Sequence, residues 1–135
     1  MSTAVVCDAS VVVALLLDSG AAGRWATAVL SDADLAAPTL LAFEAANTIR
    51  RLELAGQVSS DQAAQAHADL RDLAIELWPY EILAARAWEL RRNLSIYDAS
   101  YVALAELTAA TLVTLDARIG GAPDLRCAVA TPGGA

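Results

Sequence analysis

Residues 4–18 read AVVCDASVVVALLLD and place one carboxylate, that of Asp8, between two apolar runs. The first run, residues 4–7, predicts a short buried strand, and the second, residues 11–17, predicts a helix. A charge between two segments that both favour burial needs a reason. One explanation is helix capping, because a side-chain oxygen of Asp8 or Ser10 can accept from the free N–H groups of the following helix.

The rest of the chain alternates between short apolar runs and helical patterns. Strands are predicted at 4–8, 35–37, 75–78, 111–115 and 125–129, and helices at 11–17, 21–31, 39–55, 59–73, 81–92 and 98–109, with a short helical turn after 115. This alternation indicates an α/β fold with a parallel sheet and helices on both faces. Sites in such sheets form beyond the carboxyl ends of the strands, where the strand order reverses. No linker or repeat interrupts the pattern, so one domain spanning 1–135 is expected.

Length and composition limit the class of protein. The chain has 135 residues and is 57% hydrophobic. Its longest apolar run, Val11 to Leu17, falls far short of the ~20 residues that cross a bilayer, and no basic residue precedes it as in a signal peptide. We expect a soluble cytoplasmic protein with no membrane partner. Cys7 and Cys127 form no CxxC motif, so neither a disulfide framework nor a zinc site is indicated, and buried free thiols are expected.

The charge balance is acidic and lacks lysine. Sixteen acidic residues face nine basic ones, for a net charge of −7, and every basic residue is arginine. This balance repels nucleic-acid phosphates, yet it also fits a carboxylate site that binds a cation. The absence of lysine excludes Walker-A phosphate binding, Schiff-base chemistry and the phosphorylation site of receiver domains.

Two further aspartates stand where a site is expected. Asp116 ends the strand-like segment TLVTLD as Asp8 ends the first strand, and Thr114 lies two residues earlier, on the same face of an extended strand. Asp98 opens the helix predicted at 98–109. There it is either an N-cap or a carboxylate that the helix N-terminus stabilises beside other carboxylates.

Glu44 lies inside the mostly apolar helix TLLAFEAANTIRRLELAG. Asn47 and Thr48 share its helical face, which creates a polar patch. This patch is either a solvated face or part of a polar site.

Four segments carry a family resemblance in their order along the chain: VVCDASVVVALLL, PTLLAFEAANTIRRL, LSIYDASYVALAEL and TLVTLDARI. With them the chain resembles the PIN-domain ribonucleases, and among these the VapC-type toxins of toxin–antitoxin pairs. The resemblance implies a three-layer α/β/α sandwich with a five-stranded parallel sheet. Carried over residue by residue, the catalytic acids of the family fall on Asp8, Glu44, Asp98 and Asp116, and supporting polar residues fall on Ser10, Asn47 and Thr114.

The resemblance also implies partners. It implies an RNA substrate, a homodimer and a cognate antitoxin with a segment in a groove near the first two helices. Because those helices carry VVVALLL and WATAVL, part of their apolar surface is expected to lie under a partner. Arg91, Arg92 and Arg118 flank the aspartates and are candidates for RNA contacts, although ordinary solvated charge explains them as well.

The residue types point to metal-assisted hydrolysis. Oxygen ligands without cysteine or histidine favour Mg²⁺ or Mn²⁺ over zinc. No serine–histidine or cysteine–histidine pair is indicated, so water is the expected nucleophile. Asp8, Asp98 and Asp116 are the predicted metal ligands, and Glu44 is either a ligand or the residue that orients the water. Two carboxylates ~5 Å apart repel by roughly 3 kcal/mol at an effective dielectric constant of ~20, so a shared cation explains why four are tolerated.

Two other interpretations stay open. The chain could be a catalytically inactive PIN-fold module that binds a protein, or a small aspartate-based phosphotransfer domain. The absence of lysine opposes a receiver domain, and Ser10 stands where a haloacid-dehalogenase phosphatase needs a second aspartate.

Overall fold

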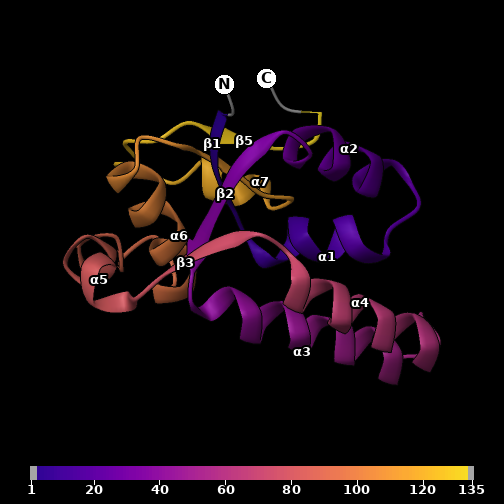
Figure 1. Ribbon diagram of the computed structural model, residues 1–135. Coiled ribbons are helices and arrows are strands. Elements are labelled where there is room, and N and C mark those ends of the chain that lie inside the picture. The colour runs from indigo at the N-terminus through magenta and orange to yellow at the C-terminus, as the bar shows by residue number, and fades with distance from the viewer. Residues whose placement is uncertain (1–2, 134–135) are drawn as a thin grey trace.

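The computed structural model describes residues 3–133, and within that range five strands alternate with seven helices (Figure 1). The elements are β1 (Thr3–Cys7), α1 (Ala9–Leu17), α2 (Ala21–Leu30), β2 (Ala33–Pro38), α3 (Leu40–Leu54), α4 (Ser60–Asp72), β3 (Ile75–Trp78), α5 (Tyr80–Glu89), α6 (Ile96–Leu107), β4 (Thr111–Val113), α7 (Ala117–Gly120) and β5 (Val129–Ala130).

The five strands form one parallel sheet in the order β3-β2-β1-β4-β5. After β1 the chain first builds the β2 side of the sheet and later returns to the β4 side. The strand order therefore reverses between β1 and β4, which is where a parallel α/β sheet forms a site at the carboxyl ends of its strands. Cys7 pairs with Val113 in register, so Asp8 and Thr114 are the residues that follow a matched pair.

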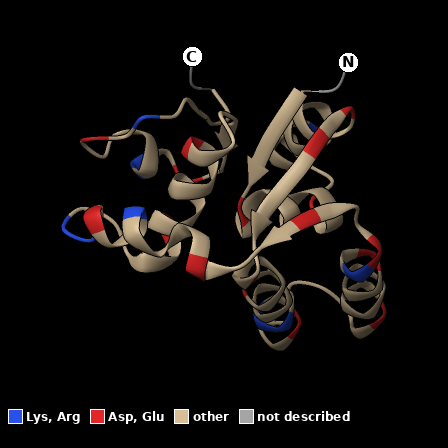
Figure 2. Ribbon diagram, turned by 60° about the vertical axis from the view of Figure 1, so that its left-hand side comes forward, with Lys and Arg blue, Asp and Glu red and all other residues tan. Residues whose placement is uncertain are grey.

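Helices cover both faces of this sheet. Helix α6 packs against β1, β2 and β4 with α5 beside it, whereas α1 and α2 lie on the other side, and α3 and α4 form a hairpin against α1 (Figure 1). The turned view in Figure 2 separates the same two groups of helices. The predicted α/β/α sandwich is confirmed.

Several predicted boundaries are wrong, and side-chain contacts explain two of them. The strand predicted at 111–115 ends at Val113 because the N–H of Leu115 donates to Ser10 instead of to a neighbouring strand. The helix predicted at 98–109 begins earlier, at Ile96, because the side chain of Ser95 caps it. The last strand is only Val129–Ala130, where residues 125–129 were expected.

The large hydrophobic side chains that are exposed lie outside the first two helices, and a partner contact of those helices stays a prediction. Val11 and Val12 of α1 are fully buried in the main core, and no large hydrophobic side chain of α1 or α2 is exposed. In α2, Gly23 permits a close helix contact, because a Cβ atom there would lie 1.7 Å from the carbonyl oxygen of Asp18. The exposed large hydrophobic side chains are instead Phe43, Leu54, Leu77, Tyr80, Ile82, Trp88, Tyr97 and Leu107.

Two smaller predictions have mixed outcomes. Both cysteines are free thiols, but only Cys7 is buried and Cys127 is partly exposed. Within residues 3–133 no single helix is long and apolar enough to cross a membrane; α1 and α2 reach that length and composition only as a pair bent by 110°.

Candidate active site

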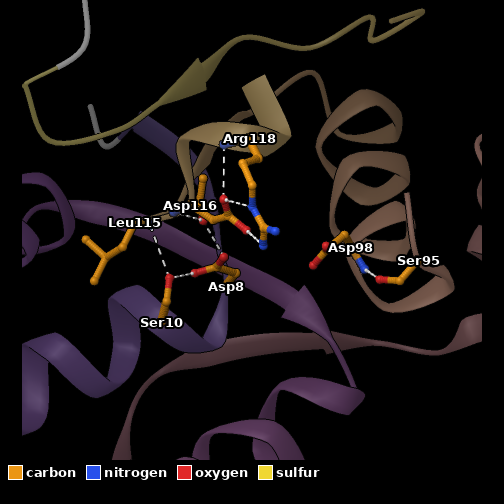
Figure 3. Close-up of polar contacts among 8 residues, drawn as sticks. Asp8, Ser10, Ser95, Asp98, Leu115, Asp116 and Arg118 are labelled. Carbon is orange, nitrogen blue, oxygen red and sulfur yellow. Dashed lines mark hydrogen bonds and ion pairs between the residues drawn. The ribbon is translucent and has the colours of Figure 1, made fainter. Parts of the chain in front are cut away.

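Asp8 lies between β1 and α1, where it is both a helix cap and a carboxylate of the candidate site. Its carboxylate caps α1 by accepting from the N–H of Val11 at 3.2 Å. It also accepts a hydrogen bond from the hydroxyl of Ser10 on one oxygen and from the hydroxyl of Thr114 on the other (Figure 3). Ser10 is therefore a donor to Asp8 and not the cap of the helix.

Each of the two hydroxyls both accepts and donates. Ser10 Oγ accepts from the N–H of Leu115 at 3.1 Å, and Thr114 Oγ1 accepts from the N–H of Asp116 at 3.0 Å. Donation from both hydroxyls to the carboxylate of Asp8 favours its ionised form. Burial raises the pKa of Asp8 above its usual value, and these hydrogen bonds act in the opposite direction.

Asp98 is not the helix cap. It is the third residue of α6, and its N–H donates to the hydroxyl of Ser95 at 3.1 Å. Because Ser95 caps the helix, the carboxylate of Asp98 is not used as a cap. The first turn of a helix favours a negative charge. Burial nevertheless raises the pKa of Asp98, and the nearby charges of Asp116 and Asp8 raise it further.

Glu44 does not lie on a solvated face, and within the described chain its side chain makes no polar contact with the side chains of Asn47 and Thr48. Its carboxylate is half-buried, and Oε1 accepts a 2.7 Å hydrogen bond from the hydroxyl of Tyr101 in α6. Burial raises the pKa of Glu44, the hydrogen bond lowers it, and the charges of Asp98 and Asp8 raise it again. Sequence reasoning missed Tyr101. Its position three residues after Asp98, one helical turn along the same face, was the available signal.

Asn47 was predicted to support the acid site, but its side chain contacts none of the four acids through a hydrogen bond within the described residues. Asn47 is exposed and makes no side-chain hydrogen bond within the described chain, whereas Thr48 donates to the backbone carbonyl of Glu44 at 2.9 Å. The predicted polar patch on this helix therefore does not extend the acid site. Thr48 instead pairs with a carbonyl of its own helix.

Asp116 caps the short helix α7 and forms an ion pair with Arg118. The guanidinium donates to both carboxylate oxygens, at 3.0 and 2.8 Å, and the N–H of Arg118 adds a third bond at 3.0 Å. These contacts hold the pKa of Asp116 below its usual value. The prediction that Thr114 and Asp116 share a strand face is wrong, since the strand ends at Val113; Thr114 is fully buried and Asp116 is partly exposed.

Of the other two candidate arginines, Arg91 and Arg92, only Arg91 makes a side-chain hydrogen bond within the described residues. The guanidinium of Arg91 lies 4.5 Å from the ring centre of Trp88 and donates to its carbonyl, whereas Arg92 is exposed. Neither forms an ion pair with an acid in the part of the chain described. Their contact with RNA stays a prediction.

The four acids come from separate elements and share one edge of the sheet. Figure 3 shows Asp8, Asp98 and Asp116 around a common space. Asp98 and Asp116 line the same cavity of about 310 Å³ with Arg118, at the first turn of α6. Glu44 lies close enough to Asp98 and Asp8 for their charges to raise its pKa. The arrangement concentrates negative charge at the point where the strand order reverses.

Residues 5–124 match the family model of the PIN domain. The chain belongs to the PIN-domain family. Ribonuclease VapC9 of Mycobacterium tuberculosis is 37% identical to it over 125 residues, covering 93% of this chain and 95% of the relative. Ribonuclease VapC1 of the same organism is 36% identical over 125 residues, covering 92% of this chain and 94% of the relative.

Solved structures agree with the PIN fold. The M. tuberculosis toxin VapC20, described as cleaving the sarcin–ricin loop, has a TM-score of 0.67 at 17% identity and covers 88% of this chain and 95% of its own. VapBC-5 from M. tuberculosis, a member of the VapBC family of toxin–antitoxin systems, has a TM-score of 0.59 at 25% identity, with 96% and 97% covered.

The residues of this PIN domain fit a divalent cation in their chemistry. All candidate ligand atoms are carboxylate oxygens, which suit Mg²⁺ or Mn²⁺, and the hydrogen bonds that Asp8 accepts on both oxygens favour its ionised form. Within residues 3–133 no three acidic, histidine or cysteine side chains lie close enough to hold one ion in this arrangement. In the same arrangement Arg118 occupies both oxygens of Asp116.

Proposed function

We propose that this PIN domain is an endoribonuclease toxin that hydrolyses RNA with water as the nucleophile and Mg²⁺ or Mn²⁺ as cofactor. The observation that carries the proposal is the set of four carboxylates at the reversal of strand order, with Asp8 anchored by two hydroxyls. The VapC ribonucleases that cover nearly the whole chain support it. We extend the proposal to one domain spanning 1–135 that acts in the cytoplasm.

Each acid has a distinct part in the proposed reaction. Asp8, Asp98 and Asp116 would hold the cation, and Glu44, which Tyr101 keeps in place, would complete the ligand set or orient the attacking water. The cation supplies a lowered pKa for water and neutralises charge on the phosphate oxygens. The three hydrogen bonds to Asp8 already fix the orientation of its carboxylate, and they favour its ionised form.

RNA binding has to overcome the net charge of −7. Positive charge near the acids comes from Arg118 and from Arg91 and Arg92, which precede the loop that lines the acid cavity. We propose that these arginines contact RNA phosphates. The cation, once bound, reduces the same repulsion.

A cognate antitoxin would bind beside the acids. A groove of about 380 Å³ lies between α1 and the α3–α4 hairpin, and Val13, Leu17, Leu52 and Val58 give it an apolar lining. Ser10, the donor to Asp8, lines the same groove. A segment seated there with an arginine at its end would reach the carboxylates and supply the positive charge that the metal otherwise brings. VapBC-5, one of the solved neighbours, belongs to the VapBC family of toxin–antitoxin systems.

A homodimer would cover other surfaces. Ile82 and Trp88 of α5 and Leu107 of α6 are each more than half exposed. Exposed large hydrophobic side chains mark contact sites more often than free surface when they gather in one region. We propose that the isolated protein is at least dimeric, and sedimentation as a monomer would contradict this.

Cleavage and toxicity test the proposal together. The purified protein should cut RNA with Mg²⁺ or Mn²⁺ and lose this activity with EDTA or with Asp8→Asn. Expression alone should slow growth, Asp8→Asn should relieve the effect, and the product of the neighbouring gene should suppress both. No cleavage by the wild type with either metal would favour an inactive protein-binding module. Equal toxicity of wild type and Asp8→Asn would separate growth inhibition from this site.

A further inference from the structure

We infer that Tyr101 is a positioning residue of the acid site and acts through Glu44. The inference rests on the proposed function, because it assigns a role to a residue outside the acidic quartet. The hydroxyl of Tyr101 donates to Glu44 Oε1 at 2.7 Å, across 57 positions in sequence. This bond leaves Glu44 Oε2 as the oxygen free to face a cation or a water molecule.

The surroundings of Tyr101 make the bond selective. The tyrosine is 2% exposed and packs in the main core. Its hydroxyl makes no other hydrogen bond within the described chain, so Glu44 is its acceptor. A buried hydroxyl without a partner is costly, and a bond from a neutral donor to a charged acceptor is among the stronger ones. Both partners therefore gain from keeping Glu44 in a single orientation.

The bond also joins two helices that pack mainly on other elements. Glu44 lies on α3, which packs on α1 and α4, whereas Tyr101 lies on α6, which packs on the sheet and α5. Among the described residues no other side-chain hydrogen bond links α3 to α6. Because Asp98 is one turn before Tyr101 on the same helix, the bond sets Glu44 relative to Asp98.

Tyr101→Phe removes this contact and keeps the ring. If Tyr101 positions Glu44, the variant should bind Mn²⁺ more weakly without RNA, by roughly tenfold in Kd, the ratio that ~1.4 kcal/mol produces. Cleavage kcat should fall in parallel at saturating RNA, whereas KM should change little. Titration of free Mn²⁺ by electron paramagnetic resonance gives the metal affinity independently of cleavage.

Two further variants make the test specific. Tyr97→Phe is the matched control, because Tyr97 lies on the same helix, is 62% exposed and has a hydroxyl that makes no hydrogen bond within the described chain. It should behave as wild type. In a Glu44→Ala background Tyr101→Phe should add little further loss, because Glu44→Ala already removes the acceptor of the tyrosine hydroxyl.

The outcomes separate this inference from the proposed function. Wild-type protein that neither binds Mn²⁺ nor cleaves RNA would overturn the proposed function, and with it the inference. Active wild type together with a Tyr101→Phe protein that matches Tyr97→Phe would overturn the inference alone. So would full additivity with Glu44→Ala, or a Tyr101→Phe protein that fails to fold by circular dichroism, since either result makes Tyr101 a structural residue.

Discussion

The hydroxyl of Thr114 donates to the carboxylate of Asp8, although 106 positions separate the two residues. The parallel pairing of β1 with β4 brings them together, because Asp8 and Thr114 follow the paired residues Cys7 and Val113. Thr114 is fully buried and also accepts from the N–H of Asp116. One hydroxyl thus links two acids of the site.

Thr114→Val should therefore destabilise the fold and weaken cleavage. The substitution keeps the shape but leaves Asp8 Oδ2 and the N–H of Asp116 without this partner. Unsatisfied buried groups cost ~1–3 kcal/mol, so the free energy of unfolding in urea should drop by about that amount. Thr111→Val on β4, the strand that ends just before Thr114, is the control, because Thr111 makes no side-chain hydrogen bond in the described chain. An equal loss there would contradict the role of Thr114.

Asp98→Asn should abolish cleavage and leave the metal-free protein as stable as wild type or slightly more stable. It relieves repulsion from Asp116 and Asp8, and the cap of α6 is supplied by Ser95. Ser95→Ala should instead lower the free energy of unfolding by ~1 kcal/mol through loss of the cap. Melting temperatures without metal compare the two; a clear drop for Asp98→Asn would mean that its carboxylate supports the fold.

Stability without metal should depend on pH in a defined direction. Asp8, Glu44 and Asp98 have pKa values raised above the usual range, mainly by burial. A raised folded-state pKa stabilises the protein fully below the ordinary carboxyl pKa of ~4 and loses that effect as pH rises through the raised values. The contribution of these acids to the free energy of unfolding should therefore fall from mildly acidic to neutral pH, and less steeply in Asp98→Asn.

Adding Mg²⁺ at neutral pH should restore that loss. A ligand that binds only the folded protein stabilises it by ~2.7 kcal/mol at a concentration of 100 times its Kd. The melting temperature should rise with Mg²⁺ in wild type and much less in Asp8→Asn. Equal rises in both proteins would point to binding outside this site.

Arg118→Ala should tighten metal binding. Arg118 occupies both oxygens of Asp116 and keeps the pKa of this acid low, so its removal frees a ligand and removes a competing cation. Arg92→Ala is the control, because Arg92 is an exposed arginine with no ion pair in the described residues. Calorimetric titration with Mn²⁺ should show a lower Kd for Arg118→Ala only. Weaker binding would mean that Arg118 helps to assemble the site.

The sequence predicts the strand–helix order well because apolar runs and helical patterns alternate cleanly along it. Asp8 could be placed at a strand end from its neighbours alone, whereas Asp116 lies beyond the end of its strand and caps α7. The cap of α6 could not be placed in this way, since Ser95 and Asp98 are both good capping residues and only backbone geometry selects Ser95. The acceptor of Tyr101 lies 57 residues away, so a pattern along the chain does not reveal it.

Contacts that single side chains make at the surface and in the site could not be predicted from the sequence either. The apolar segment of α1 suits both a buried helix and a partner contact. Val11 and Val12 are buried in the main core, whereas Val13 and Leu17 line the groove proposed for the antitoxin, and the sequence pattern does not separate the two. The ion pair between Arg118 and Asp116 depends on a short helix that turns the arginine back toward the acid. Spacing alone placed this arginine only near the site.

The pairing of β1 with β4 has a consequence for the order in which the protein acquires activity during synthesis. Asp8 leaves the ribosome early, but Thr114, which anchors it, and Asp116, which lines the acid cavity, follow more than a hundred positions later. Domains form as their sequence emerges, so a growing chain lacks the complete acid set until its last segments are made. A chain cut short before β4 would leave Asp8 without its donor and the cavity without one wall, and such fragments should be harmless to the cell that makes them.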